Sequence, residues 1–494
     1  MAFDSSEYRQ NTYGAPDYYC DCTRSLMSNG DGSLGDPWNL EQAMANAVAG
    51  DVVGFLPVST GTPVDMDAPS ASGYSEIPAF QPANSGSGTA NANRIIFVTK
   101  YAAVKLYKDD PSGIGTNQSR TELRHAGTAA VAAGASETGT GGACYGAHTR
   151  NYITYDGFYV DMAEAEIRSD TGVLAAQACT GITFKNFVVK GTTTNCQSNA
   201  IIYRPENAVD TILSNFVAYD FSNDPTGSDT QQAGLFSDQY GDQNFLIEHF
   251  EIDDIDMGIF LKGTSSGPVF NYGTIQYGIV SNTASPLRFN DLDPTNLTTV
   301  QYVLTYNTIG ARPKALSPDG IVFDVISSSP RNITIDHCTV AKIDSTDGNC
   351  NGAFFVEGSE FALGSGITIT NNIFDLDSGS YGHMMYLESA LPGTMNYNFY
   401  YKNGATETYV YNSTEYNSFA SWQAAISGRD ANSVEGSSSP FNNRASDDYT
   451  INTGHAAYTM SSTSGQVGAY ATNETIGVET TAAASSGSLA FFLR

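Results

Sequence analysis

The sequence predicts an all-β fold in which short strands wind into a single-stranded right-handed parallel β-helix with an N-terminal helical cap and an irregular C-terminal region. Three observations predict it: a strand pattern that recurs about every 30 residues, a second strand between its copies, and one amphipathic helical segment near the start. A β-sandwich would instead show turns about every 8–12 residues without a longer period.

The first recurring strand alternates β-forming residues and carries a polar or small residue at its fifth position. Its eight copies begin 24 to 34 residues apart, at Ile153, Ile182, Thr211, Phe245, Val269, Val303, Ile333 and Ile367. The fifth positions are Gly157, Asn186, Asn215, His249, Gly273, Asn307, His337 and Asn371. Because Gly and Asn adopt left-handed backbone geometry readily, we expect a bend there, with His249 and His337 as hydrogen-bonding bend residues.

A second strand recurs between these copies, as in GIFLK from Gly258 and GIVFD from Gly320. Alternation predicts an inward set: Leu235, Ser237, Ile259, Leu261, Leu287, Phe289, Ile321, Phe323, Phe354, Val356, Met385 and Leu387. One outward column then reads Ile202, Phe236, Phe260, Arg288, Val322, Phe355, Tyr386, and the next reads Arg204, Asp238, Lys262, Asn290, Asp324, Glu357, Glu388. Since coils stack about 4.8 Å apart, these columns form a ribbon of aromatic rings flanked by charged groups.

The amphipathic segment near the start predicts a cap, because an open solenoid end exposes a sheet edge and apolar core. Asn39 and Gln42 fit a capping box, and Gly50 follows where the helix would stop. One face of this helix carries four apolar residues, Leu40, Met44, Ala47 and Val48.

The pattern divides the chain into five parts. These are an N-terminal extension (1–27), the cap and first coils (28–150), the central coils (151–394), C-terminal coils with an irregular cap (395–478), and a flexible linker with an apolar tail (479–494).

Composition excludes several classes of protein. The 494 residues are 41% hydrophobic, which supports a large core, and 52 acidic against 23 basic residues give a net charge of −29. A nucleic-acid-binding protein needs a basic face, so that class is set aside. We expect no membrane insertion and no signal peptide, because the chain has no apolar run of spanning length and MAFDSSEYRQ has no basic start before an apolar stretch. Seven scattered cysteines indicate reduced thiols and synthesis in a reducing cytoplasm.

Three stretches resemble the right-handed parallel β-helix, or pectate-lyase-like, superfamily. They are NGDGSLGDPWNLEQAMANAVAGDVV, SGTANANRIIFVTKY and the late FASWQAAISGRDANSVEG with SPFNN and DDYTIN, and together with the coils they span roughly residues 28–471. The resemblance implies the fold. It leaves activity open, because this fold hosts lyases, hydrolases, epimerases and phage tailspikes.

Two catalytic arrangements fit the outward columns. Lys262 and Arg288, one coil apart, resemble the Lys base and Arg stabiliser of chondroitinase-B-like and alginate lyases, which implies β-elimination on a uronate. That family carries acidic calcium ligands just before the Lys, whereas Met257 and Gly258 precede the strand here. The other arrangement is a hydrolase pair, Asp324 with Glu357 or Glu357 with Glu388, about 5 Å apart as in retaining enzymes. No metal site is assigned, although such a pair could hold Ca²⁺.

The outward rings and polar groups also predict glycan binding, since sugars stack on aromatic faces and hydrogen-bond to carboxylates and amides. The glycan-binding candidates are Phe236, Asp238, Phe260, Asn290, Phe355, Tyr386 and Arg204. The alternative is that a loop or a neighbouring subunit covers these rings.

We therefore expect a phage virion surface protein, of tailspike, tail-fibre or head-decoration type, that binds a host or environmental polysaccharide, with cleavage left open. It would be made in the host cytoplasm, assemble as a homo-oligomer (a trimer is favoured), and contact other virion proteins through its N-terminal extension and C-terminal tail. The alternative is a stand-alone polysaccharide lyase that reaches the extracellular space without a signal.

Overall fold

A computed structural model describes residues 13–24, 28–56, 64–67, 81–100, 122–126, 143–147, 149–161, 171–176, 179–191, 199–204, 208–221, 233–237, 243–262, 272–290, 296–308, 319–324, 332–343, 352–356, 366–377, 382–388, 391–403 and 408–479. The chain forms two compact units. The first comprises residues 1–247, 252–255 and 262–271, and the second comprises 248–251, 256–261 and 272–494. Strand β14 (Gln243–Lys262) contributes residues to both.

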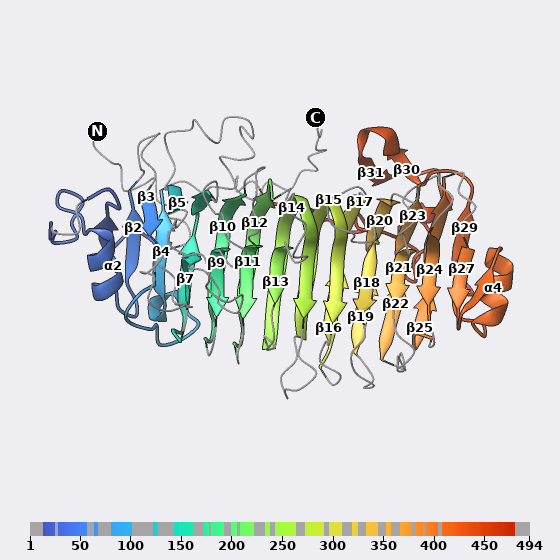
Figure 1. The fold of residues 1–494 in the computed structure, drawn as a ribbon, viewed down its shortest axis with the longest axis horizontal. Coiled ribbons are helices and arrows are strands. Elements are labelled where there is room, and N and C mark those ends of the chain that lie inside the picture. Colours follow the sequence, from blue (N-terminus) through green and yellow to red (C-terminus); the bar gives the residue numbers. More distant parts are fainter. Residues whose placement is uncertain are drawn as a thin grey trace, which may run out of the picture. The chain divides into compact units, whose positions relative to one another are not determined.

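In the first unit, strands of successive coils lie side by side (Figure 1) and pair in parallel along three ladders, which we name the first, second and third sheets. The first sheet contains β1 (Tyr18–Cys20), β2 (Val52–Phe55), β4 (Ile95–Thr99), β7 (Ile153–Asp156) and the early parts of β10 (Thr183–Lys190) and β12 (Ile212–Tyr219). The second contains β3 (Val64–Asp67), β5 (Glu122–Ala126), β8 (Tyr159–Asp161) and the later parts of β10 and β12. The third contains β6 (Ala143–Ala147), β9 (Thr171–Ala176), β11 (Asn199–Arg204) and β13 (Ala233–Ser237).

The second unit repeats this arrangement, and β15 (Tyr272–Asn290) runs through all three of its sheets. The first sheet continues with β16 (Thr298–Gln301), β19 (Ile333–Asp336), β22 (Ile367–Thr370) and β25 (Thr394–Asn396). The second continues with β17 (Leu304–Thr308), β20 (Thr339–Ile343), β23 (Ile373–Leu376), β26 (Phe399–Lys402) and β29 (Val434–Gly436). The third continues with β18 (Ile321–Asp324), β21 (Gly352–Val356), β24 (His383–Leu387) and β27 (Thr408–Tyr411), and β28 (Thr414–Tyr416) pairs antiparallel to β27.

These parallel registers confirm the predicted all-β parallel β-helix. The inward residues stack in rows because each strand pairs with the equivalent strand of the next coil. In the first unit, Tyr155 stacks on Phe97 (ring centroids 5.5 Å apart) and on Phe184 (5.3 Å). In the second unit, Phe374 stacks on Tyr400 at 5.7 Å. Such offset rows of fully buried rings contribute to the core beyond their buried area.

The predicted cap helix is α2 (Leu40–Asn46), and its capping box is confirmed: the Asn39 side chain accepts the Gln42 amide while the Gln42 side chain accepts the Asn39 amide. Ala43, Met44 and Ala47 are buried. The expectation for Val48 is wrong, because the helix ends at Asn46 and leaves Val48 50% exposed. The short helix η2 (Asn91–Asn93) precedes β4.

The predicted bends are confirmed at Gly157, Asn186, Asn215, His249, His337 and Asn371, all of which have positive φ. The expectation for Gly273 is wrong, because this residue lies inside β15. Asn307 has the expected positive φ, although it follows the main bend of its coil by five residues. The bend residues of these coils are Tyr277 (φ 55°) and Tyr302 (φ 53°). Their left-handed geometry is costly for a bulky residue, and stacking of the rings along the column opposes that cost.

The C-terminal end of the second unit is closed by α4 (Phe419–Ala425), whose Trp422 is fully buried and stacks on Tyr409 at 5.3 Å. Neither described α-helix, at seven residues each, has the length that a membrane-spanning helix requires.

Residues 441–479, here named the clasp, then fold back over the second sheet of the second unit. The clasp contains the hairpin β30 (Phe441–Asn443) and β31 (Asp448–Ile451) and the short helices η3 (Arg444–Ser446) and η4 (Ala456–Tyr458). Its apolar side chains pack on outward residues of β17, β20, β23 and β26, in one cluster: Leu304, Ala341, Ile373, Phe399, Tyr401, Phe441, Tyr449, Ile451, Ala457, Val467 and Ala469. Arg444 adds ion pairs to Asp375 (2.7 Å) and Asp377 (3.2 Å).

Candidate functional site

The outward column of the third sheet keeps one register through the second unit. Arg288 pairs with Val322, Val322 with Phe355, Phe355 with Tyr386, and Tyr386 with Val410. We call the outward side of these strands the third-sheet face. In Figure 1, β18, β21, β24 and β27 lie side by side, so the five positions form a straight track across the strands.

Residues along these strands point alternately into the core and outward, as the sequence predicts. Every described member of the inward set that lies in the second unit is buried: Ile259, Leu261, Leu287, Phe289, Ile321, Phe323, Phe354, Val356, Met385 and Leu387. The residues between them therefore point outward. The side chain of Ser237 lies outside the described residues.

At one end of the track, Arg288 lies over the ring of Phe260, with its guanidinium carbon 5.7 Å from the ring centroid. Arg288 is half-buried, whereas Phe260 is only 4% exposed and Val322 only 2% exposed. The Phe260 ring is thus not an open stacking surface, contrary to the expectation of an exposed aromatic ribbon. Its contact with Arg288 instead holds a cation on the outer face.

At the other end, Tyr386 and His383 of β24 form a half-buried ring pair, with centroids 5.3 Å apart and an interplanar angle of 47°. Burial lowers the pKa of His383, and the carboxylate of Glu415 partly offsets this shift. Glu388 follows Tyr386 by two residues and is also half-buried. This end of the track therefore combines a ring surface, a neutral imidazole at pH 7 and acidic groups.

Strand β28 extends the track by one more position. Its antiparallel register places Glu415 opposite Val410, which itself pairs with Tyr386 on its other side. Sequence reasoning missed both Glu415 and His383, because β28 follows no coil period and His383 shows no metal-ligand spacing. His383 could have been found from its place three residues before Tyr386 at the start of the recurring strand.

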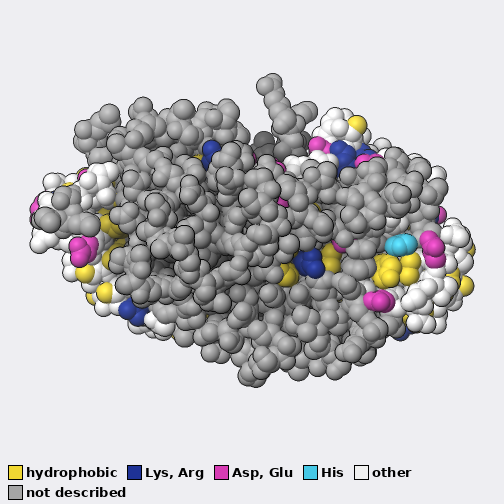
Figure 2. Space-filling view, in the orientation of Figure 1, with side chains coloured by type: hydrophobic (Ala, Val, Ile, Leu, Met, Phe, Trp, Pro, Cys, Tyr) yellow, Lys and Arg dark blue, Asp and Glu magenta, His cyan; other side chains and the backbone are white. Residues whose placement is uncertain are grey.

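Figure 2 shows this side of the molecule in the orientation of Figure 1. Hydrophobic, basic, acidic and histidine side chains appear there between residues whose placement is not described. The described part of this side therefore exposes hydrophobic, basic, acidic and histidine side chains.

Several predicted site residues have no described side chain. Backbone register places Phe236 opposite Ile202, Asn290 opposite Asp324 and Phe355 opposite Tyr386. The side chains of Arg204, Phe236, Lys262, Asn290, Asp324 and Phe355, and the whole of Asp238 and Glu357, lie outside the described residues. Lys262 belongs to the first unit and Arg288 to the second. The lyase pair and the carboxylate pairs therefore stay predictions.

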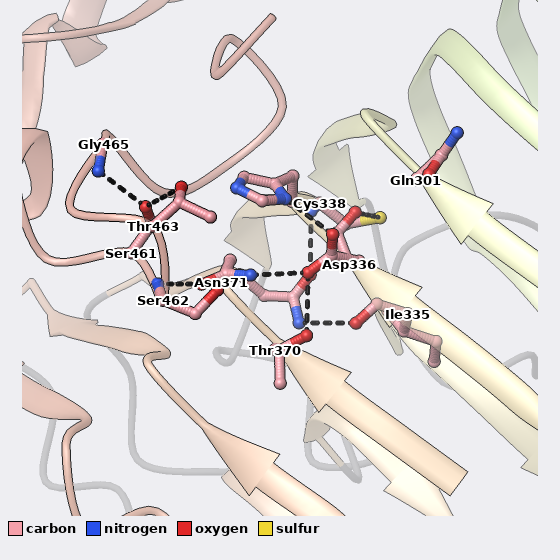
Figure 3. A network of polar contacts seen from close by, with 12 residues as sticks. Gln301, Ile335, Asp336, Cys338, Thr370, Asn371, Ser461, Ser462, Thr463 and Gly465 are labelled. Carbon is pink, nitrogen blue, oxygen red and sulfur yellow. Dashed lines mark hydrogen bonds and ion pairs between the residues drawn. The ribbon is translucent and has the colours of Figure 1, made fainter.

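A second polar cluster lies at the His337 bend (Figure 3). Asp336 contacts Nδ1 of His337 at 2.7 Å and accepts hydrogen bonds from Thr370 Oγ1 and Asn371 Nδ2, each at 2.7 Å. Burial opposes ionisation of Asp336, but these bonds and the His337 charge together hold its pKa below the ordinary value. Asn371 in turn accepts the Ser462 amide at 2.8 Å, so this cluster attaches the clasp to the coils.

No group of three or more His, Cys, Asp or Glu side chains within the described ranges could hold a metal ion. Four cysteines with described side chains, Cys20, Cys22, Cys179 and Cys338, are buried and form no disulfide with one another. Burial raises the pKa of Cys338 to about 12, so this thiol stays protonated at neutral pH.

Comparisons with known proteins concern the fold. No family model and no curated protein matches the sequence. Among solved structures, the chain is similar to the pectate lyase Pel9A at 11% identity and a TM-score of 0.48, over 92% of this chain and 95% of that one. It is also similar to the GH136 lacto-N-biosidase from Eubacterium ramulus at 11% identity and a TM-score of 0.39, over 81% of this chain and 67% of that one. The strand registers of the chain itself make it a parallel β-helix.

Proposed function

We propose that this protein binds a polysaccharide along the third-sheet face of its second unit. The observation that carries the proposal is the half-buried ring pair of Tyr386 and His383. Tyr386 lies in the same outward column as Arg288, and the half-buried Glu388 follows it by two residues. An aromatic ring can stack on the apolar face of a sugar, and the imidazole and carboxylates can hydrogen-bond to its hydroxyls. Arg288 suits a carboxylate substituent on the same glycan.

The dimensions of the face suit an extended ligand. Arg288 and Glu415 are separated by five strand steps, or about 24 Å at roughly 4.8 Å per step. Because Val322 and Val410 between them are almost fully covered, the contacts concentrate at the two ends. A glycan that spans both ends would meet a cation at one and a ring with acidic groups at the other.

The setting that we propose is the surface of a phage virion, where a homotrimer would display this face and contact other virion proteins. The N-terminal extension and C-terminal tail assigned to those contacts lie largely outside the described residues. The alternative proposal is a stand-alone lyase acting on uronate-containing glycans. Native mass and light scattering separate the two: a stable trimer supports the first, and a monomer that releases unsaturated uronate from an acidic glycan supports the second.

Binding is tested on a microarray of acidic and neutral polysaccharides, followed by affinity titration of the best ligand. Tyr386→Ala is expected to weaken binding about two- to twelvefold, since loss of an aromatic stacking contact costs about 0.5–1.5 kcal/mol. Arg288→Ala should weaken binding of acidic glycans selectively. Tyr458→Ala is the matched control, because Tyr458 is an exposed tyrosine (37%) in the clasp. Unchanged affinity in Tyr386→Ala would contradict the proposal.

A further inference from the structure

The end of the clasp is attached to the bend at His249. The imidazole Nδ1 lies 3.1 Å from the carbonyl oxygen of Thr475, and Nε2 lies 3.8 Å from Oε1 of Glu479. The His249 side chain is 12% exposed, and its ring stacks on that of Tyr277 at 5.0 Å. We name residues 475–479 the latch.

Two backbone amides of the latch are also held. Gly477 N donates to the carbonyl of Tyr277 at 2.9 Å, and Val478 N donates to Oε1 of Glu251 at 3.3 Å. Gly477 has φ 88° and is buried, so the chain turns tightly against β14 and β15 at this point. These amides give two local reporters of whether the latch is seated.

The contact with Thr475 fixes the tautomer of His249. A carbonyl oxygen only accepts hydrogen bonds, so Nδ1 must carry the hydrogen. In the neutral imidazole, Nε2 then presents a lone pair to the carboxylate of Glu479, which is unfavourable. Protonation places an N–H⁺ at Nε2, facing the same oxygen, and the interaction becomes attractive.

The other titratable groups around the latch also favour a protonated His249. The described groups that face it are Glu248 and Glu251 from β14, Tyr277 from β15, and Glu474 and Glu479 from the clasp itself. Burial raises the pKa of Tyr277, with Glu474 and Glu248 adding to the shift, so this phenol stays neutral through the physiological range. An imidazolium at His249 therefore faces acidic groups from both β14 and the clasp.

We propose that His249 is a proton-operated switch for the clasp, so that protonation seats residues 475–479 on the second unit and deprotonation loosens them. The device is independent of glycan binding at the third-sheet face. It makes the attachment of the clasp's end tighter in acid than in alkaline solution, because the cationic imidazole faces a carboxylate.

Hydrogen exchange of the full chain, read by mass spectrometry at peptides covering the latch, tests the switch. After correction for intrinsic exchange, protection of the Gly477 and Val478 amides is expected to be about two- to fivefold higher near pH 5 than near pH 8, the range for a half-exposed ion pair. His249→Asn should abolish this difference. Asn occupies the equivalent bend at Asn186, Asn215 and Asn371, so the variant keeps the backbone geometry.

Two further variants keep the test sharp. Glu479→Gln retains the size of the side chain and should flatten the pH dependence without changing the bend. His337→Asn is the matched control: His337 occupies the same bend column, but its Nδ1 contacts Asp336, so the latch should keep its pH dependence. The inference is overturned if His249→Asn or Glu479→Gln retains the full wild-type difference, or if protection is higher near pH 8.

Discussion

Replacement of Asn372 by Ala should strongly destabilise the second unit. Asn372 is fully buried, and its side chain makes three hydrogen bonds: Oδ1 accepts the Cys338 amide (2.8 Å), and Nδ2 donates to the Ile335 carbonyl and to Asn398 Oδ1 (each 3.1 Å). Each is worth about 1 kcal/mol net, and an unsatisfied buried partner costs about 1–3 kcal/mol. We therefore expect a loss of about 3 kcal/mol in the free energy of unfolding.

Urea unfolding followed by far-UV circular dichroism and by tryptophan fluorescence measures this loss. Thr368→Ala is the control from the same coil: Thr368 points outward, is half-buried, and its hydroxyl has no hydrogen-bond partner among the described residues. That variant should lose less than about 1 kcal/mol. A loss below about 1 kcal/mol in Asn372→Ala would refute the idea that these stacked amides hold successive coils together.

Three further perturbations test other parts of the fold by the same unfolding assay. Gly278→Ala should cost about 1–3 kcal/mol or more, because a Cβ there would overlap the buried Phe250 ring; a neutral effect would show that this packing is wrong. Trp422→Ala should cost about 3–5 kcal/mol by emptying the C-terminal cap, and an unchanged midpoint would contradict its buried placement. The pKa of Asp336 is lower in the folded protein than in the unfolded chain, where it is about 3.9. Its contribution to the free energy of unfolding is therefore present above about pH 3.9 and is lost as the pH falls through the folded pKa. Asp336→Asn should make the loss of stability in acid less steep, and an unchanged pH dependence would count against the network.

The coil architecture could be predicted from the sequence because its physical cause is local. Alternation in segments such as those around Ile321 and Phe354 fixes which side chains face the core, and the roughly 30-residue period stacks equivalent strands. The capping box of Asn39 and Gln42 likewise depends on residues three positions apart. Each of these signals is contained in a short stretch of sequence, so the coils and the helix cap could be predicted without knowledge of distant contacts.

The bend column shows where local signals fail. Gly273 and Asn307 have the residue types that favour left-handed geometry, yet the main bends of their coils are at Tyr277 and Tyr302. Tyrosine disfavours that geometry intrinsically. Stacking of Tyr277 on Tyr302 (5.5 Å) and of Tyr302 on His337 (5.2 Å) joins residues from different coils, which no local propensity reveals.

The candidate site was predicted in part. Register and face were correct for Arg288 and Tyr386, because both follow from alternation. The sequence left open whether the Phe260 ring is exposed or covered, since exposure depends on chain segments remote in sequence, and the structure shows it buried. The sequence predicted an irregular C-terminal region but not that residues 441–479 fold back over the second sheet, because these residues carry no coil period and pack on the apolar face beneath them.

The central claim, that the third-sheet face binds a glycan, is tested most directly by a crystal structure with an oligosaccharide cut from the best microarray ligand. The account predicts sugar density stacked on Tyr386 beside His383 and extending along the track toward Arg288. Density on another sheet, or a ligand that binds tightly in solution and leaves the third-sheet face bare in the crystal, would contradict it.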